Sequence, residues 1–206
     1  MDRQTLRAML PIDETVAYLN TGASGPVTTR VQDAATAAIR QQAGAADPYA
    51  EAAAITDAAR EQVAAFVGAP PETVAFTQST TAAINAGILA CELEPGERVL
   101  TTAIEHGAVR LPLARQRRRG VDVTTIEAPD GRVDREAYSA AVGQADLVVV
   151  SAVSWTHGTV LPVPALVEEA HDAGARVLVD AVQSVGQRPV DVRSWGADLV
   201  AFAGHK

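Results

Sequence analysis

The hydrophobic residues of this chain fall into two patterns that alternate along the sequence. Short, continuous runs of Val, Leu and Ile predict strands buried on both faces, and the other pattern, with apolar residues at helical spacing, predicts helices. The predicted strands are residues 74–76, 98–102, 121–126, 146–151, 176–179 and 199–202, and the predicted helices are residues 31–43, 51–67, 80–91, 134–142 and 166–173, with one more that runs through Arg118 and ends at Gly120. Strands that alternate with helices indicate an α/β domain with a mostly parallel sheet.

The composition is that of a globular protein with an acidic surface. The chain is 48% hydrophobic and 20% charged, with a formal net charge of −8, which excludes a disordered or collagen-like chain. Its acidity argues against nucleic acid as a partner. The one basic run, residues 115–119, has no interleaved aromatic residues and is better explained as the solvated end of a helix.

The counts of cysteine and lysine exclude several classes of site. The single cysteine, Cys91, excludes a disulfide framework and a cysteine-based zinc site, and we expect no metal. Lys206 is the one lysine among 17 basic residues. Because a Walker-type loop needs Gly-Lys-Ser/Thr, none can lie before residue 206. A dinucleotide-binding oxidoreductase is also disfavoured, since residues 22–26 have the wrong spacing and a proline for Gly-x-Gly-x-x-Gly.

We expect a cytoplasmic protein with no membrane segment. The first residues carry charges of both signs and lead into no apolar run of the kind a signal peptide needs. Apolar runs such as residues 147–150 are far shorter than the ~20 residues needed to cross a bilayer.

Four polar clusters follow predicted strands. They are residues 78–81, the pair Glu105–His106, Asp180 with Gln183, and the pair His205–Lys206. Ligands in open parallel sheets bind at the carboxyl ends of the strands. The convergence of these clusters therefore predicts a ligand site at that edge of the sheet.

Each cluster also has a purely structural interpretation. Thr80 and Thr81 could bind a phosphate at the positive end of a helix, or they could cap that helix. Asp180 could pair with a cation or cap the next turn. His106 could contact a ligand or cap the helix that follows it. Lys206 could be a reactive amine or an incidental residue.

Around these clusters the sequence closely resembles the class V aminotransferases among the pyridoxal phosphate enzymes, especially their cysteine desulfurase and selenocysteine lyase branch. The resemblance covers nearly the whole chain, and the matching segments are residues 18–22, 79–85, 105–106, 153–163, 179–186 and 197–206. It implies the large domain of a fold type I pyridoxal-phosphate-dependent transferase with a mostly parallel sheet. We expect an N-terminal segment at residues 1–30 and this large domain, truncated at its C-terminus, at residues 31–206.

The resemblance implies three catalytic residues. Lys206 is similar to the lysine that holds pyridoxal phosphate as a Schiff base and moves protons at the substrate α-carbon. Asp180 resembles the carboxylate that pairs with the pyridinium nitrogen and keeps the ring protonated as an electron sink. His106 matches the imidazole that stacks on the ring.

Four further residues complete the implied cofactor site. Gln183 matches a residue hydrogen-bonded to the phenolic oxygen of the cofactor, and Thr80, Thr81 and His205 match phosphate contacts. A non-catalytic α/β binding module is the alternative of a different class. The joint retention of Asp180, Gln183, His205 and Lys206 argues against it.

Two residues depart from the desulfurase pattern. Ala203 stands where many relatives have a phosphate-binding serine, and Trp155 stands where desulfurases commonly have an asparagine. The stretch around Trp155 and residues 19–22 are instead similar to isopenicillin N epimerase-like proteins. His157, in the same loop, could reach the cofactor or be a surface residue. Residues 180–183 are similar to the desulfurases, so we expect a reaction of the cysteine desulfurase or selenocysteine lyase type, with transamination or epimerisation of an amino acid as the alternative.

The resemblance also bears on the thiol and on the length of the chain. Desulfurases accept sulfur on a loop cysteine beyond the lysine, whereas Cys91 precedes Lys206 and ends a predicted helix, so we expect it to be buried and inert. Family members continue past this lysine into a small domain. We therefore expect an N-terminal fragment that is inactive alone, from a protein that by resemblance forms a homodimer.

Overall fold

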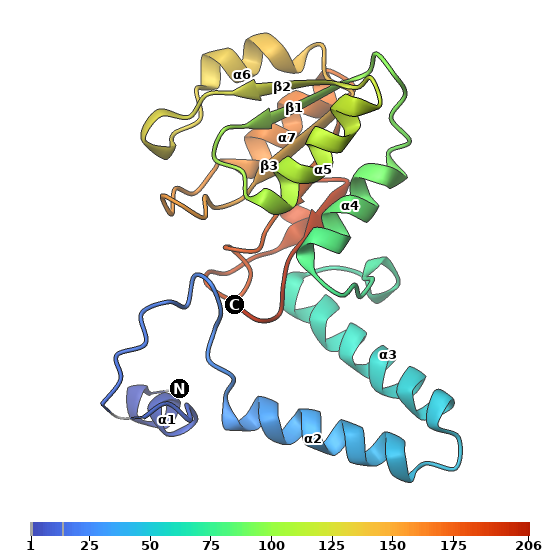
Figure 1. Ribbon diagram of the computed structural model, residues 1–206, viewed down its shortest axis with the longest axis vertical. Helices are drawn as coiled ribbons and strands as arrows, with labels where there is room; N and C mark the ends of the chain where they lie inside the picture. Colours follow the sequence, from blue (N-terminus) through green and yellow to red (C-terminus); the bar gives the residue numbers. More distant parts are fainter. Residues whose placement is uncertain (1, 14) are drawn as a thin grey trace. The chain divides into compact units, whose positions relative to one another are not determined.

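The computed structural model describes residues 2–13 and 15–206. Their contacts divide them into two compact units (Figure 1): one contains the residues up to Ala75 together with His205 and Lys206, and the other is Phe76–Gly204. No helix within the described residues is long and apolar enough to cross a membrane.

The unit Phe76–Gly204 is built on a sheet of five parallel strands. Their order is β2 (Asp122–Ile126), β1 (Arg98–Thr102), β3 (Leu147–Ser151), β4 (Arg176–Asp180) and β5 (Leu199–Ala201). In the register of β3 with β4, Ser151 pairs with Asp180, so two polar residues end adjacent strands. The predicted α/β class with a parallel sheet is confirmed.

Helices cover both faces of this sheet. The cluster on one face includes residues of α4 (Thr80–Ala90) and α5 (Gly107–Arg118), and that on the other includes residues of α6 (Arg135–Val142) and α7 (Val163–Asp172). Leu147 and Val149 of β3 belong to the first cluster, and Val148 and Val150 belong to the second. Burial on both faces explains why this strand is continuously hydrophobic.

The predicted strand at residues 74–76 is wrong. Val74 is extended after a 3-10 turn, η1 (Pro71–Thr73), and residues 74–76 form no strand among the described residues. The carbonyl of Val74 instead accepts a hydrogen bond from the guanidinium of Arg60. A short apolar run becomes a strand only where a neighbouring strand takes up its backbone groups.

Three helices make up most of the other unit. They are α1 (Arg3–Ala8), which the sequence did not predict, α2 (Thr29–Gly44) and α3 (Pro48–Val67). Thr28 caps α2, and α3 begins with an Asp47 cap followed by Pro48 and ends at Gly68 in the left-handed region. The division at residues 30 and 31 stays a prediction about the family's domains, and residues 1 and 14 of its first part lie outside the described residues.

Candidate functional site

Asp180 lies at the carboxyl edge of the sheet, at the end of a strand that has a neighbour on each side. It ends β4, is 5% exposed, and pairs in register with Ser151 of β3 and Ala201 of β5. Its Oδ1 accepts a hydrogen bond from the N–H of Val182 at 3.0 Å, so it caps the turn that follows. A carboxylate with little access to water gains much from a cationic partner. The site therefore suits a ligand that carries a positive charge.

Gln183 follows Asp180 in the same turn. It lies between Val182 and the buried Ser184 and is itself half-buried. Its amide can donate and accept hydrogen bonds. The turn after β4 thus brings a carboxylate and an amide to the carboxyl edge of the sheet.

Helix α4 points its first turn toward the same edge. Its C-terminal end lies at the amino end of β4, because the carbonyl of Cys91 accepts a hydrogen bond from Nη2 of Arg176 at 2.7 Å. The helix also packs closely on the sheet: a Cβ at Gly87 would lie 2.5 Å from Cδ1 of Leu178. The N-terminus of α4 is therefore on the carboxyl side of β4.

Ser79, rather than either threonine, caps α4. Its Oγ accepts a hydrogen bond from the N–H of Ala82 at 3.1 Å, which leaves the hydroxyls of Thr80 and Thr81 outside the cap. Within the described residues, Oγ1 of Thr80 and Oγ of Ser184 are the buried side-chain oxygens with no hydrogen-bond partner. A buried hydroxyl beside the free N–H groups of a helix start is suited to binding phosphate.

His106 is the N-cap of α5. Its Nδ1 accepts a hydrogen bond from the N–H of Ala108 at 3.1 Å, which assigns the proton of the neutral ring to Nε2. The ring also meets the ring of Trp155 edge-on, with centroids 5.1 Å apart and planes at 89°. The capping interpretation is thus correct, and the cap orients an imidazole that remains exposed.

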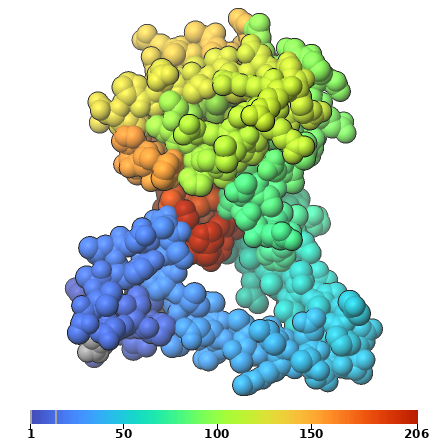
Figure 2. Space-filling model, viewed as in Figure 1, coloured from blue at the N-terminus to red at the C-terminus, as the bar shows by residue number. Residues whose placement is uncertain are grey.

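Trp155 comes from the loop after β3, which an antiparallel bridge between Val153 and Val160 closes. This loop, orange in Figure 2, reaches the surface, and the Trp155 side chain is 50% exposed. In the same loop, His157 packs against the turn before α6, since its ring occupies the space that a Cβ at Gly131 would need. The sequence marked Trp155 as a departure from the desulfurase pattern, and its contact with His106 was not predicted.

Glu105 is a second buried carboxyl group at this edge. It is 1% exposed and accepts hydrogen bonds from the Oγ1 of Thr102 at 2.5 Å and from the N–H and Oγ of Ser151 at 3.1 and 2.6 Å. Burial raises its pKa from 4.5 to about 7, although the hydrogen bonds from Ser151 and Thr102 lower it. The negative charge of Asp180 adds to the increase. The sequence marked Glu105 only as the neighbour of His106. Its position just after a buried strand was the available signal.

His205 and Lys206 belong to the other compact unit. There the carbonyl of His205 accepts a hydrogen bond from the N–H of Gly25 at 2.7 Å. A Cβ at Gly25 would lie 3.3 Å from that carbonyl oxygen and 3.6 Å from the Cα of Lys206, so the glycine permits a close approach. The hydroxyl of Tyr18 donates to the carbonyl of Ser24 at 2.8 Å in the same segment. The structure thus joins the last two residues to the segment that follows the motif at residues 18–22.

Two other features lie away from these residues. Cys91 is buried, at 4% exposure, and burial raises the pKa of its thiol, which makes it a poor nucleophile.

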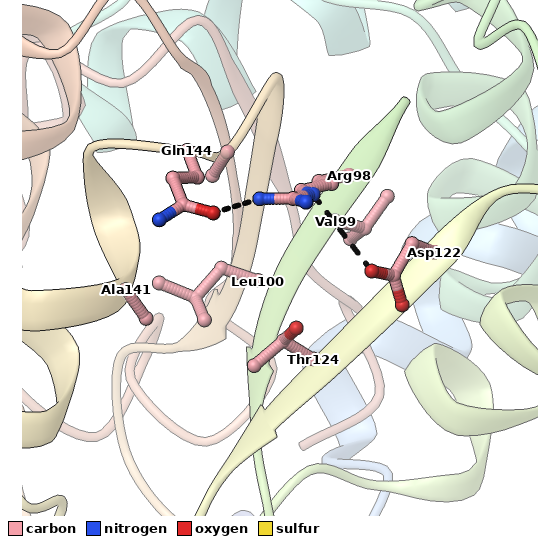
Figure 3. A pocket seen from close by; sticks show the side chains of 8 residues that line it. Arg98, Val99, Leu100, Asp122, Thr124, Ala141 and Gln144 are labelled. Atoms are coloured by element: carbon pink, nitrogen blue, oxygen red, sulfur yellow. Dashed lines mark hydrogen bonds and ion pairs between the residues drawn. The ribbon is translucent and has the colours of Figure 1, made fainter. Parts of the chain in front are cut away.

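A pocket of about 340 Å³ lies at the amino ends of β1 and β2 (Figure 3), where Arg98 forms an ion pair with Asp122 at 3.8 Å and a hydrogen bond with Gln144. This pocket is at the opposite edge of the sheet from Asp180. No cluster of three potential metal ligands occurs in the part of the chain that the structure describes.

Comparison with protein families identifies the class of the chain. The family model for class V aminotransferases matches residues 17–206. The chain therefore belongs to the class V aminotransferase family, as the sequence motifs indicated.

Individual relatives place the chain near one branch of this family. It is 36% identical over 213 residues to a probable cysteine desulfurase from Methanothermobacter thermautotrophicus, covering 100% of this chain and 53% of the relative. A cysteine desulfurase from Haloferax volcanii is 39% identical over 164 residues, covering 76% of this chain and 38% of the relative. The apo structure of a cysteine desulfurase from Thermococcus onnurineus NA1 superposes with a TM-score of 0.90 at 29% identity, covering 99% of this chain and 53% of that one. This chain spans about half the length of the relatives it matches, or less.

Proposed function

We propose that this chain carries the pyridoxal phosphate site of an enzyme that acts on an amino acid, and that the reaction is cysteine desulfuration. The observation that carries the proposal is Asp180, a carboxylate buried at the carboxyl end of a central strand. The chain belongs to the class V aminotransferase family, and by the resemblance of Asp180 to the carboxylate of these pyridoxal phosphate enzymes it would serve the ring nitrogen.

The residues at the sheet edge fit the ring of this cofactor. Asp180 would pair with the pyridinium nitrogen, because a poorly hydrated carboxylate favours a cationic partner. His106, oriented by its cap and by Trp155, would lie on the ring face. Gln183 would donate a hydrogen bond to the phenolic oxygen.

The start of α4 fits the phosphate. Oγ1 of Thr80 is buried without a partner among the described residues, and a phosphate oxygen would satisfy it. Thr81 adds a second hydroxyl, and the helix start adds positive potential. His205 would be a further phosphate contact by the family resemblance.

Lys206 would hold the cofactor through its amine. When bound, pyridoxal phosphate supplies an electron sink for the α-carbon of the substrate. The residues of the chain supply the rest: Nζ of Lys206 would take and return the α-proton, and Asp180 would keep the ring nitrogen protonated.

The named relatives support desulfuration as the reaction. Several are described as cysteine desulfurases or probable cysteine desulfurases, and such an enzyme moves the sulfur of cysteine to an acceptor thiol and leaves alanine. Trp155, in place of the usual asparagine, favours a second candidate, an epimerase-like or transaminase reaction. Three assays separate these reactions: alanine formed from cysteine, with sulfide released in the presence of a thiol reductant; amine transfer to a keto acid; and racemisation of an amino acid.

Two properties of the whole protein are also proposed. By the family resemblance we propose a homodimer, which sedimentation of the complete protein tests. We also propose a cytoplasmic location, which fractionation of the host cell tests.

The cofactor proposal is tested with the complete protein that contains this chain. On addition of pyridoxal phosphate, a visible absorption band of bound cofactor is expected in the wild type and is expected to vanish in Lys206→Ala. Asp122→Ala, at the opposite edge of the sheet, is the matched control and should keep the band. A wild-type protein without the band would contradict the proposal.

A further inference from the structure

Glu105 joins the ends of two strands at the proposed cofactor site. It stands between β1 and α5, and its carboxyl group is hydrogen-bonded to Thr102 at the end of β1 and to Ser151 at the end of β3. Ser151 is paired in register with Asp180, at the end of β4. Glu105 also directly precedes His106. One buried side chain therefore connects the turn that carries His106 with the strand ends beside Asp180.

The groups that surround Glu105 can satisfy it with or without a proton. The N–H of Ser151 and the hydroxyl of Thr102 donate to Oε1. The Oγ of Ser151 lies 2.6 Å from Oε2, and a hydroxyl can donate to a carboxylate or accept from a carboxylic acid. This partner therefore allows the charge to change without leaving a buried polar group unsatisfied.

The charged neighbours of Glu105 set which of the two acids is ionised. Asp180, on β4, is the ionisable group whose charge acts on Glu105. From β1 and β3 the facing groups are the uncharged Thr102 and Ser151, and His106 turns its Nδ1 toward its own helix. Two neighbouring carboxyl groups have different pKa values when their surroundings differ, so one can be ionised while the other is protonated. Glu105 is enclosed more fully than Asp180.

We propose that Glu105 is a positioning residue that holds the turn carrying His106 against β3 and that its carboxyl group, enclosed by Thr102 and Ser151, holds an exchangeable proton beside Asp180. The proposal deepens the cofactor function and rests on it for its role. A protonated Glu105 adds no charge beside Asp180. An ionised Glu105 adds a second negative charge, which strengthens the hold on a cationic ring nitrogen.

The proton of Glu105 can be measured without any cofactor. In the complete, cofactor-free protein, infrared spectroscopy follows the C=O stretch of a buried carboxylic acid as the pH rises. The wild type should lose one such band near pH 7, and Glu105→Gln should lack it. Thr102→Val keeps the shape of the side chain but removes one donor to the carboxylate, so its band should persist to a pH about one unit higher.

A second readout connects this proton with the cofactor. The absorption of bound pyridoxal phosphate should change with pH in a step at the pH of the infrared transition, and Glu105→Gln should remove that step. If Glu105 had a purely structural role, Glu105→Gln would alter the amount of bound cofactor. It would not remove a step in cofactor absorption that occurs at the pH of the infrared transition.

Either of two results would contradict a proton held by Glu105. If wild type and Glu105→Gln titrate alike between about pH 5 and about pH 9, or if Thr102→Val leaves the infrared transition in place, the inference is wrong. If Glu105→Gln does not fold, the pH of the infrared transition in Thr102→Val, compared with the wild type, tests the inference by itself. A protein that shows the infrared transition but binds no pyridoxal phosphate would contradict the proposed function and leave the stored proton established.

Discussion

The ring of Trp155 meets the ring of His106 edge-on, with centroids 5.1 Å apart and planes at 89°. The two residues come from the loops that follow β3 and β1, which are adjacent strands. The hydrogen bond from the N–H of Ala108 to Nδ1 fixes the imidazole from its own helix, and Trp155 fixes it from the neighbouring loop. The orientation of His106 therefore depends on a residue outside the desulfurase pattern.

Trp155→Ala should weaken the binding of pyridoxal phosphate about five-fold, whereas Trp155→Phe should retain most of the affinity. An edge-to-face aromatic pair contributes about 1 kcal/mol, which corresponds to that factor. Titration followed by the absorbance of the cofactor measures it. Equal affinities for the alanine variant and the wild type would show that the contact does not orient His106 for the ring.

Thr80→Val should lower the affinity for pyridoxal phosphate about 10- to 100-fold, because a hydrogen bond to a charged group contributes about 1.5–3 kcal/mol. Pyridoxal, which lacks the phosphate, is the matched control ligand, and its binding should be unaffected. The hydroxyl has no partner among the described residues, so the cofactor-free variant should be as stable as the wild type. A loss of affinity for both ligands would place Thr80 away from the phosphate.

Ser79→Ala should lower the stability of the cofactor-free protein, which Thr80→Val should leave unchanged. Ser79 caps α4 through the N–H of Ala82, and loss of such a cap lowers the free energy of unfolding by about 1 kcal/mol. Chemical denaturation of the cofactor-free protein measures this effect, with Thr80→Val as the control one residue away. If Thr80→Val were the more destabilising of the two, the assignment of the cap would be wrong.

Stability should fall with rising pH through the titration of Glu105. The unfolded chain releases this proton near the ordinary pKa of 4.5, whereas the folded protein keeps it to about pH 7. The folded state therefore binds more protons between these values, and the stability it gains is complete below pH 4.5 and lost as the pH passes about 7. The loss amounts to about 3 kcal/mol.

The difference in unfolding free energy between the wild type and Glu105→Gln, measured against pH, isolates this contribution. Titrating groups that do not interact with Glu105 are common to both proteins and cancel, so the difference reports Glu105 together with its interaction with Asp180. A difference that is independent of pH over this interval would mean that Glu105 stays ionised in the folded protein.

The sheet was predictable because its strands are buried on both faces. Such burial selects continuous Val and Leu runs, and β1, β3 and β4 lie within a residue of their predicted bounds. Helix α7 begins earlier than predicted, at Val163, because Pro164 fits the first turn of a helix, where its missing N–H is not needed.

The positions of Asp180 and His106 after strands were predictable, whereas the strand expected before residues 78–81 is absent from the described residues and the contacts of the candidate site were not predicted. Asp180 and His106 follow hydrophobic strands, and that signal is local in the sequence. The contact between Trp155 and His106 and the enclosure of Glu105 by Ser151 depend on how loops from different strands pack. Nothing in the residues themselves specifies that packing, so the sequence pointed to Glu105 only as a neighbour of His106.

The most direct test of the central claim is to locate the cofactor on the chain. The complete protein is loaded with pyridoxal phosphate and reduced with borohydride, which fixes an amine-linked cofactor to its lysine, and the peptides are mapped by mass spectrometry. Lys206 is the one lysine in these 206 residues, so an adduct within them identifies its site without ambiguity. The account predicts the adduct on Lys206, and an adduct confined to another residue of the protein, or none at all, would contradict it.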